Sequence, residues 1–217
     1  MLPVPQAREA EKAWAKAHPQ LAEKLETWFA KKLPEIKWDE LNLKTRAATR
    51  VSSAEMLAYF SGRIENMIVM SADLANSDRT DGFLKNSKPL LKGDFSGGFL
   101  HVGVSELTMA ALANGMALHG GIIPVCGTFF VFSDYMKPAI RLAALMQQQV
   151  IYVWTHDSFR VGEDGPTHQP VEQEAQIRLM ESLKNHSRKS SLISLRPADW
   201  AETLYAWKIA LEIGRPS

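Results

Sequence analysis

Short apolar runs alternate with helix-forming segments along most of this chain, and that alternation restricts the fold more than any other feature of the sequence. The runs have the length and the branched or aromatic character of buried strands. We expect strands at 66–70, 99–104, 122–132, 150–155 and 191–196, with helices at 52–62 or 53–62, 106–119, 134–148 or 137–148, 170–184 and 200–213. A long polar loop is expected over 78–98. Strands that alternate with helices form a mainly parallel sheet covered on both faces, so the sequence predicts a three-layer α/β/α fold.

The first 45 residues differ in character from the rest. The stretch 6–32 is rich in Ala, Glu, Lys and Leu, and Pro19 is expected to split it into two helices. It leads into an irregular segment at 33–42. We therefore expect a helical arm or linker at 1–45 and one α/β domain at 46–217; an ordinary pair of surface helices is the alternative for the arm.

The overall charge balance argues against several classes of partner. With 25 Lys and Arg against 24 Asp and Glu, the net charge is +1, so no global field attracts nucleic acid or an anionic membrane. Cys126 is the only cysteine, which excludes a disulfide framework and a cysteine-based zinc site. Residues 1–8 lack a signal-peptide core, and no apolar segment reaches the ~20 residues needed to span a bilayer. We expect a cytoplasmic protein.

The loop 156–170 is the segment most suited to chemistry. It follows the predicted strand 150–155 and combines two imidazoles, three carboxylates and a guanidinium with two Gly and two Pro. Ligands of open α/β sheets bind outside the carboxyl ends of the strands, and stiff loops hold their groups in place before a ligand arrives. A second polar loop, 71–77, also follows a predicted strand. The alternative is a charged solvent loop whose Gly-Glu-Asp-Gly-Pro is merely a turn.

The predicted helix 106–119 is apolar on nearly every face and must be buried. Glu106 in its first turn is the exception. The helix dipole favours a carboxylate there, but burial of the charge costs several kcal/mol unless a partner shares it. A capping residue close to solvent is the alternative. Four aromatic residues near the next strand end, Phe129, Phe130, Phe132 and Tyr135, form either core or a stacking platform for a flat ligand.

Six motifs occur in series along the chain. They are Gly103-Val-Ser-Glu106, Leu118-His-Gly-Gly121, Gly127-Thr-Phe-Phe-Val-Phe-Ser-Asp-Tyr135, Thr155-His-Asp-Ser158, Gly162-Glu-Asp-Gly-Pro-Thr-His-Gln-Pro170 and Arg196-Pro-Ala-Asp199. In this order and spacing they closely resemble transketolase. The resemblance covers roughly 46–216 and corresponds to the pyrimidine-binding domain of that thiamine diphosphate enzyme.

The resemblance implies how the cofactor is held. In the family a glutamate bonds the pyrimidine ring nitrogen para to the exocyclic amine, so that the amine in its imino form can act as the base that generates the thiazolium carbanion. Glu106 matches that glutamate, and the cofactor is the partner that a buried carboxylate needs. Phe129, Phe132 and Tyr135 match the pyrimidine pocket, and Asp73 matches a further position near the cofactor.

The resemblance also implies a substrate side. It assigns His156 and Asp164 to sugar hydroxyls, and Arg50, Ser77 and His168 to the phosphate of a sugar phosphate. A phosphate is well bound by such charge-assisted donors. Catalytic roles are implied for Glu106, His156 and His168, in the transfer of a two-carbon ketol unit between sugar phosphates.

The sequence departs from the family at several points. Ser105 stands where transketolases usually carry Arg, and a small residue at this position is closer to related families such as deoxyxylulose phosphate synthase. The segment 178–196 is several residues longer than is usual in the family. The Gly-Asp-Gly motif with a later Asn, through which family members bind the diphosphate and Mg²⁺, does not occur, and Glu163-Asp-Gly165 belongs to the substrate loop. A further phosphate-binding Arg and a third domain, both expected beyond Ser217, are also missing.

These departures lead to expectations about assembly. We expect a fragment, or one chain of a split enzyme, whose diphosphate-binding domain with its Mg²⁺ lies on a partner. Alone, the chain should bind thiamine diphosphate weakly, be inactive and associate with itself into homo-oligomers such as a homodimer. The alternative from another class is a non-catalytic dimerisation or binding module of the same fold.

Overall fold

The computed structural model describes residues 4–158, 161 and 164–213, and its centre is a sheet of four parallel strands. The strands are β1 (Met67–Ser71), β2 (Phe99–His101), β3 (Ile123–Phe129) and β4 (Ile151–Thr155). Their order is β2-β1-β3-β4, with Ser71 paired to Gly127 and Phe129 paired to Thr155. All four carboxyl ends therefore meet at one edge of the sheet.

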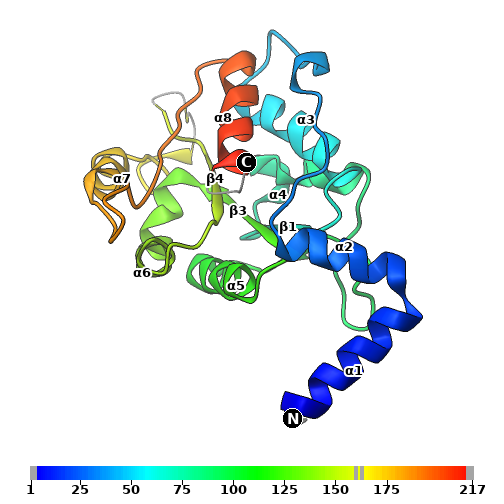
Figure 1. Ribbon diagram of the computed structural model, residues 1–217. Coiled ribbons are helices and arrows are strands. Elements are labelled where there is room, and N and C mark those ends of the chain that lie inside the picture. The colour runs from blue at the N-terminus through cyan, green and yellow to red at the C-terminus, as the bar shows by residue number, and fades with distance from the viewer. Residues whose placement is uncertain (1–3, 159–160, 162–163, 214–217) are drawn as a thin grey trace.

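Helices cover both faces of this sheet (Figure 1). The α-helices are α1 (Val4–Ala17), α2 (Pro19–Phe29), α3 (Thr49–Ser61), α4 (Ala75–Asp78), α5 (Glu106–His119), α6 (Ser133–Leu145), α7 (Gln173–Ser182) and α8 (Trp200–Glu212). Three 3-10 helices are η1 (Trp38–Glu40), η2 (Thr80–Lys85) and η3 (Phe130–Phe132). None of the helices described is long and apolar enough to cross a membrane.

Two separate apolar cores follow from the alternation of side chains along each strand. On one face, Val69 and Val125 pack with α3 and α8. On the other face, Met70 and Cys126 pack with α5 and α6. The predicted α/β/α fold is thus confirmed, and the sheet edge is held rigidly between two helical layers.

The arm helices occur where Pro19 predicted a break. Neither α1 nor α2 contains a buried residue, and α1 points away from the body of the chain (Figure 1). At its end, α2 is anchored to the domain, where the Phe29 ring lies 5.8 Å from that of His119.

The predicted strand at 191–196 is wrong. Among the described residues β4 pairs only with β3. The Ser194 amide donates instead to Glu181 Oε1 of α7 at 3.0 Å, and the Ser191 amide donates to the Leu183 carbonyl at 3.1 Å. These bonds satisfy the backbone away from the sheet. A groove of about 1450 Å³ lies between β4, α6, α8 and this segment, and it reaches Arg50 and His156.

Several element boundaries also differ from those predicted. The apolar run 122–132 ends as a strand at Phe129 and continues as η3, because an apolar run does not by itself distinguish strand from helix. The strand predicted over 99–104 stops at His101, and α7 begins at Gln173. Helix α3 begins at Thr49, so Ser52 and Ser53 are buried inside the helix and do not cap it.

Candidate functional site

The residues predicted to bind ligands follow the carboxyl ends of the strands. Asp73 and Ser77 come after β1, and Phe129 and Phe132 lie at the end of β3. In the order β2-β1-β3-β4, the chain runs from β1 to β2 on one side and from β3 to β4 on the other, so the two connections leave in opposite directions. Open α/β sheets bind their ligands between two neighbouring strands with this property, which is called the topological switch point. The topology therefore places the candidate site outside the ends of β1 and β3.

Three aromatic rings form a stepped stack at this edge. The centroids of Phe129 and Phe132 lie 6.0 Å apart with nearly parallel planes, and those of Phe132 and Tyr135 lie 6.2 Å apart. Phe129 is only 5% exposed, whereas Tyr135 is 61% exposed. The ring surface open to a flat ligand is therefore that of Phe132 and Tyr135, and Phe129 supports it from within.

His156 occupies the end of β4 and makes contacts on both ring nitrogens. Arg50 Nη1 lies 3.0 Å from His156 Nε2, and Thr155 Oγ1 lies 2.9 Å from Nδ1. The backbone of His156 has φ of 55°, a left-handed conformation that turns the chain sharply after the strand. Burial lowers the pKa of His156, and the neighbouring Arg50 charge lowers it further. Thr155 was not among the predicted site residues, although its position directly before His156 in the sequence could have indicated that it contacts the imidazole.

The loop after β4 brings two more predicted residues toward His156. The His168 ring meets Phe132 edge-on, with centroids 5.4 Å apart, and lies 6.1 Å from Phe129. Asp164 is exposed, and its charge opposes the lowering of the His156 pKa. His168 thus lies between the aromatic stack and the polar side of the site. Glu163, in the same loop, falls outside the described residues.

Arg196 fixes the beginning of this loop. Its Nε donates to Asp157 Oδ2 at 3.0 Å, and its Nη2 donates to the Asp157 carbonyl at 2.7 Å. A third contact joins Arg196 Nη1 to Glu174 Oε2 at 3.4 Å. The residue after His156 is therefore tied to α7, which holds the imidazole at the sheet edge.

Glu106 is buried at the start of α5. It is 6% exposed, which rules out a position in open solvent. Across the described part of the chain no group donates a hydrogen bond to its carboxylate, whose oxygens are not among the fully enclosed polar atoms and so keep some contact with solvent beside the positive end of the helix dipole.

The loop after β1 is organised by a buried carboxylate that the sequence analysis missed. Asp78 is 1% exposed and accepts hydrogen bonds from Ser71 Oγ at 2.9 Å and Thr80 Oγ1 at 2.6 Å. Burial raises the pKa of Asp78. This network fixes the neighbouring Ser77, whose carbonyl accepts from Arg50 at 3.2 Å. Asp73 is exposed, with φ of 65°, a left-handed backbone conformation.

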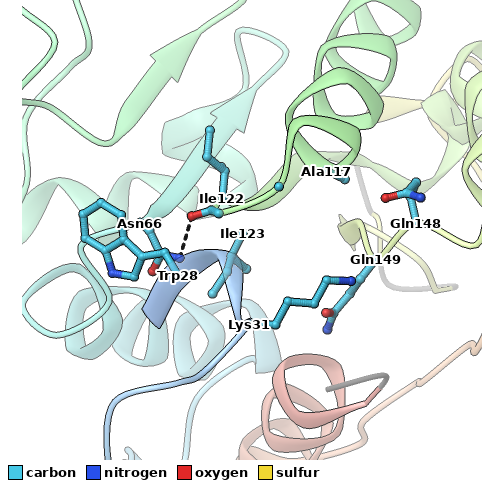
Figure 2. Close-up of a pocket in the computed structure, with 10 residues that line it drawn as sticks. Trp28, Lys31, Asn66, Ala117, Ile122, Ile123, Gln148 and Gln149 are labelled. Carbon is cyan, nitrogen blue, oxygen red and sulfur yellow. Dashed lines mark hydrogen bonds between the residues drawn. The ribbon is translucent and has the colours of Figure 1, made fainter. Parts of the chain in front are cut away.

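A small pocket lies at the opposite edge of the sheet. Figure 2 shows Trp28 and Lys31 from the arm facing Asn66 and Ile123, which lie at the amino ends of β1 and β3. The volume of this pocket is about 30 Å³. At its wall, Asn66 Nδ2 donates a hydrogen bond to the Gly121 carbonyl at 2.8 Å. A space of this size holds at most a water molecule or two. It lies between the end of α2 with Lys31 and the amino ends of the strands, and it cannot accommodate a cofactor.

Comparisons with known proteins agree on one family. A family model described as the pyrimidine-binding domain of transketolase matches residues 45–217. The chain is 46% identical over 218 residues to a transketolase of Halalkalibacterium halodurans and 47% identical over 203 residues to one of Bacillus subtilis. These matches cover 95% and 92% of this chain but only 31% and 29% of the relatives.

Solved structures give the same result. Transketolase from Leishmania mexicana superposes with a TM-score of 0.84 at 36% identity, covering 96% of this chain and 31% of that one. A split-gene transketolase, described as an inactive beta4 tetramer, superposes with a TM-score of 0.55 at 26% identity, covering 78% of this chain and 48% of that one.

Proposed function

We propose that this chain, which belongs to the family of transketolase pyrimidine-binding domains, forms the pyrimidine-binding half of a thiamine diphosphate site. The complete enzyme would transfer a two-carbon ketol unit between sugar phosphates. One observation carries the proposal: Glu106 is buried without a hydrogen-bonding partner among the described residues, on the sheet edge that also presents the half-buried ring of Phe132 and the exposed ring of Tyr135. A flat heterocycle with a basic ring nitrogen satisfies both features.

The described residues fit the pyrimidine ring of the cofactor. Phe132 and Tyr135 offer ring faces for stacking, which contributes about 0.5–1.5 kcal/mol per aromatic pair beyond the area buried. A hydrogen bond between the Glu106 carboxyl group and the pyrimidine ring nitrogen would give that carboxyl group the partner it lacks among the described residues. Asp73 is assigned to a further position near the cofactor. Thiamine diphosphate supplies the nucleophilic carbon that carries the ketol unit.

The polar side of the site suits a sugar phosphate. Arg50 carries the permanently charged, forked donor that phosphate oxygens prefer, and Ser77 and His168 complete the phosphate site in this proposal. His156 and Asp164 bond the sugar hydroxyls. Glu106, His156 and His168 are the groups we assign to catalysis.

The chain is proposed to act in an assembly. It spans 31% and 29% of the length of the two transketolases compared above, and a diphosphate-binding domain or subunit with Mg²⁺ would provide the other wall of the site. In this proposal residues 46–217 form the pyrimidine-binding domain and residues 1–45 form the arm. We also propose that the complete enzyme is cytoplasmic.

The outer face of α5 supports self-association into a homo-oligomer such as a homodimer. Its exposed residues are Leu107, Thr108, Ala111, Leu112, Gly115, Leu118 and His119. None of these is an acid, a lysine or an arginine, so a second copy could pack on this face without burying such a charge. The tetramer named for the split-gene relative is in keeping with this proposal.

Reconstitution tests the proposed activity. The chain would be mixed with a transketolase diphosphate-binding domain, thiamine diphosphate, Mg²⁺, xylulose 5-phosphate and ribose 5-phosphate, and ketol transfer would be measured. We expect activity in the mixture and none from the chain alone. Glu106→Gln should lower the rate by about 10²–10⁴-fold, as for loss of a positioned proton-transfer group.

The matched control is Glu65→Gln, because Glu65 is an exposed surface glutamate paired with Lys24. This control should keep full activity. Full activity of the Glu106→Gln mixture would refute the assignment of Glu106, and ketol transfer by the chain alone would refute the need for a partner.

A further inference from the structure

Gln173, the first residue of α7, is buried at the point where the loop after β4 ends. It is 2% exposed, and both ends of its side-chain amide are bonded. Its Nε2 donates to Asp134 Oδ2 on α6 at 2.9 Å, and its Oε1 accepts from the Val171 amide at 2.9 Å. A side-chain amide can donate and accept at once, whereas a carboxylate only accepts. The two bonds therefore require an amide at position 173.

Asp134 lies in the first turn of α6, between Phe132 and Tyr135 in the sequence. Lys137, three residues later on the same helix, forms an ion pair with Oδ1 of Asp134 and leaves Oδ2 for Gln173. The bond between Gln173 and Asp134 therefore ties the end of the loop to the helical turn that carries the outer rings of the aromatic stack.

His168 lies five residues before Gln173, and the chain between the two residues is stiff. Pro170 has a fixed φ, and the Val171 amide is bonded to Gln173. The His168 ring meets Phe132 edge-on, with centroids 5.4 Å apart. A displacement of Gln173 from α6 should thus move the His168 ring relative to Phe132.

We propose that Gln173 is a positioning residue, which holds His168 against the aromatic stack through its bond to Asp134. This inference rests on the proposed function, in which His168 contacts the phosphate of the sugar phosphate and Phe132 stacks on the pyrimidine ring. Gln173 is itself buried, so it acts through His168 and not on the ligands directly. The bond sets how far the phosphate site lies from the pyrimidine pocket.

The chain itself shows whether this bond positions His168. The carbon-bound ring hydrogens of His168 lie close to Phe132 and carry a ring-current shift, so ¹H–¹³C NMR distinguishes them from those of the exposed His186. In Gln173→Glu a second carboxylate faces Asp134 and donates no hydrogen bond. We expect the His168 signals of this variant to move most of the way towards those of His186.

A second variant makes the test independent of a substitution in the core. Asp134→Ala removes the acceptor from α6, where the Asp134 side chain is 38% exposed. This variant should move the His168 signals in the same direction as Gln173→Glu. A His168→Gln variant assigns the signals.

Reversing the two groups provides the rescue. When Asp134→Asn is combined with Gln173→Glu, the new amide on α6 can donate to the new carboxylate on α7, so the His168 signals should return close to their wild-type positions. Gln176→Glu is the matched control. It makes the same change one turn further along α7, where the side-chain oxygen of Gln176 accepts from Lys137 and a carboxylate can do the same. This variant should keep the wild-type signals.

Ketol transfer in the reconstituted mixture measures the consequence for the reaction. Because a misplacement of about 1 Å can cost about 10²-fold, kcat/KM for xylulose 5-phosphate should fall by about 10–100-fold in Gln173→Glu and recover in the reversed pair. If the His168 signals stay in place in both single variants, or if the reversed pair does not restore them, positioning by this bond is refuted and the proposed function is untouched. If the signals move but ketol transfer keeps its full rate, the assignment of His168 to the reaction is refuted, and the role of Gln173 with it.

Discussion

The imidazole of His156 lies against the ring of Phe129, with centroids 3.7 Å apart and planes inclined by 30°. The contact joins the ends of β3 and β4, where Phe129 pairs with Thr155 in the sheet. It covers the ring of Phe129 and contributes to the burial that lowers the pKa of His156. The inner member of the aromatic stack thus supports the polar side of the site, while the outer members are left for a ligand.

Phe129 and Tyr135 should consequently behave differently when changed to Leu. Phe129→Leu replaces a buried ring by a smaller side chain, so the free energy of unfolding should fall by about 1–2 kcal/mol. Tyr135→Leu should change it by no more than about 0.5 kcal/mol, because the side chain is exposed. Urea unfolding measures both. Tyr135→Leu should instead weaken cofactor binding in the reconstituted enzyme by roughly 2–10-fold; equal stabilities for the two variants would contradict the division of roles.

Asp78 should make stability depend on pH. Its pKa is raised above the ordinary value of 3.8 by burial, so the folded chain holds the proton more tightly than the unfolded chain. This contribution is fully present below the ordinary pKa and is lost as pH rises through the raised one. The Asp78→Asn variant has no carboxyl group to protonate and so lacks this pH-dependent contribution. The free energy of unfolding of the variant minus that of the wild type should therefore be more favourable to the variant at about pH 7 than at about pH 4. Urea unfolding at both pH values checks this, with Asp39→Asn as an exposed control. A difference independent of pH would contradict the prediction.

The packing of α8 on α3 includes one buried polar contact. Trp207 Nε1 donates to Ser53 Oγ at 3.1 Å, and both residues are buried. In a double-mutant cycle of Trp207→Phe and Ser53→Ala, we expect a coupling energy of about 1 kcal/mol. Additive effects in urea unfolding would show that the bond does not stabilise the fold.

The uncharged face of α5 should mediate association between copies. Leu112 lies in the middle of this face and is 42% exposed, so Leu112→Glu would place a charge there without disturbing the core. Sedimentation velocity should show the wild-type chain shifting to larger species as concentration rises, and the variant remaining smaller. Leu179→Glu, on α7, is the matched control and should behave like the wild type. If Leu112→Glu associates as strongly as the wild type, α5 is not the interface.

The sequence by itself determined the class of fold, whereas it left open whether Glu106 is buried or caps its helix close to solvent, and the structure decided for burial. Hydrophobic periodicity is a local property, so it predicted a parallel sheet between helices. It also predicted that the apolar helix 106–119 is buried, which is wrong for one face of α5, where residues such as Leu107 and Leu112 are exposed. The polar loops after two of the predicted strands, 71–77 and 156–170, likewise indicated the edge of the sheet at which we propose the site. Its motifs identified the family, whose pyrimidine-domain model matches residues 45–217.

Tertiary structure alone decided how those residues meet. The strand expected at 191–196 did not form, because Glu181 on α7 captures the Ser194 amide that a sheet would otherwise bond. The contact between Arg50 and His156 joins residues 106 positions apart, and the buried network of Asp78 lay inside a segment expected to be a loop. The local pattern of apolar and polar residues indicates which side chains are buried. Which distant groups then compete for the same hydrogen bond depends on strand register and helix packing, and these exist only once the whole chain has folded.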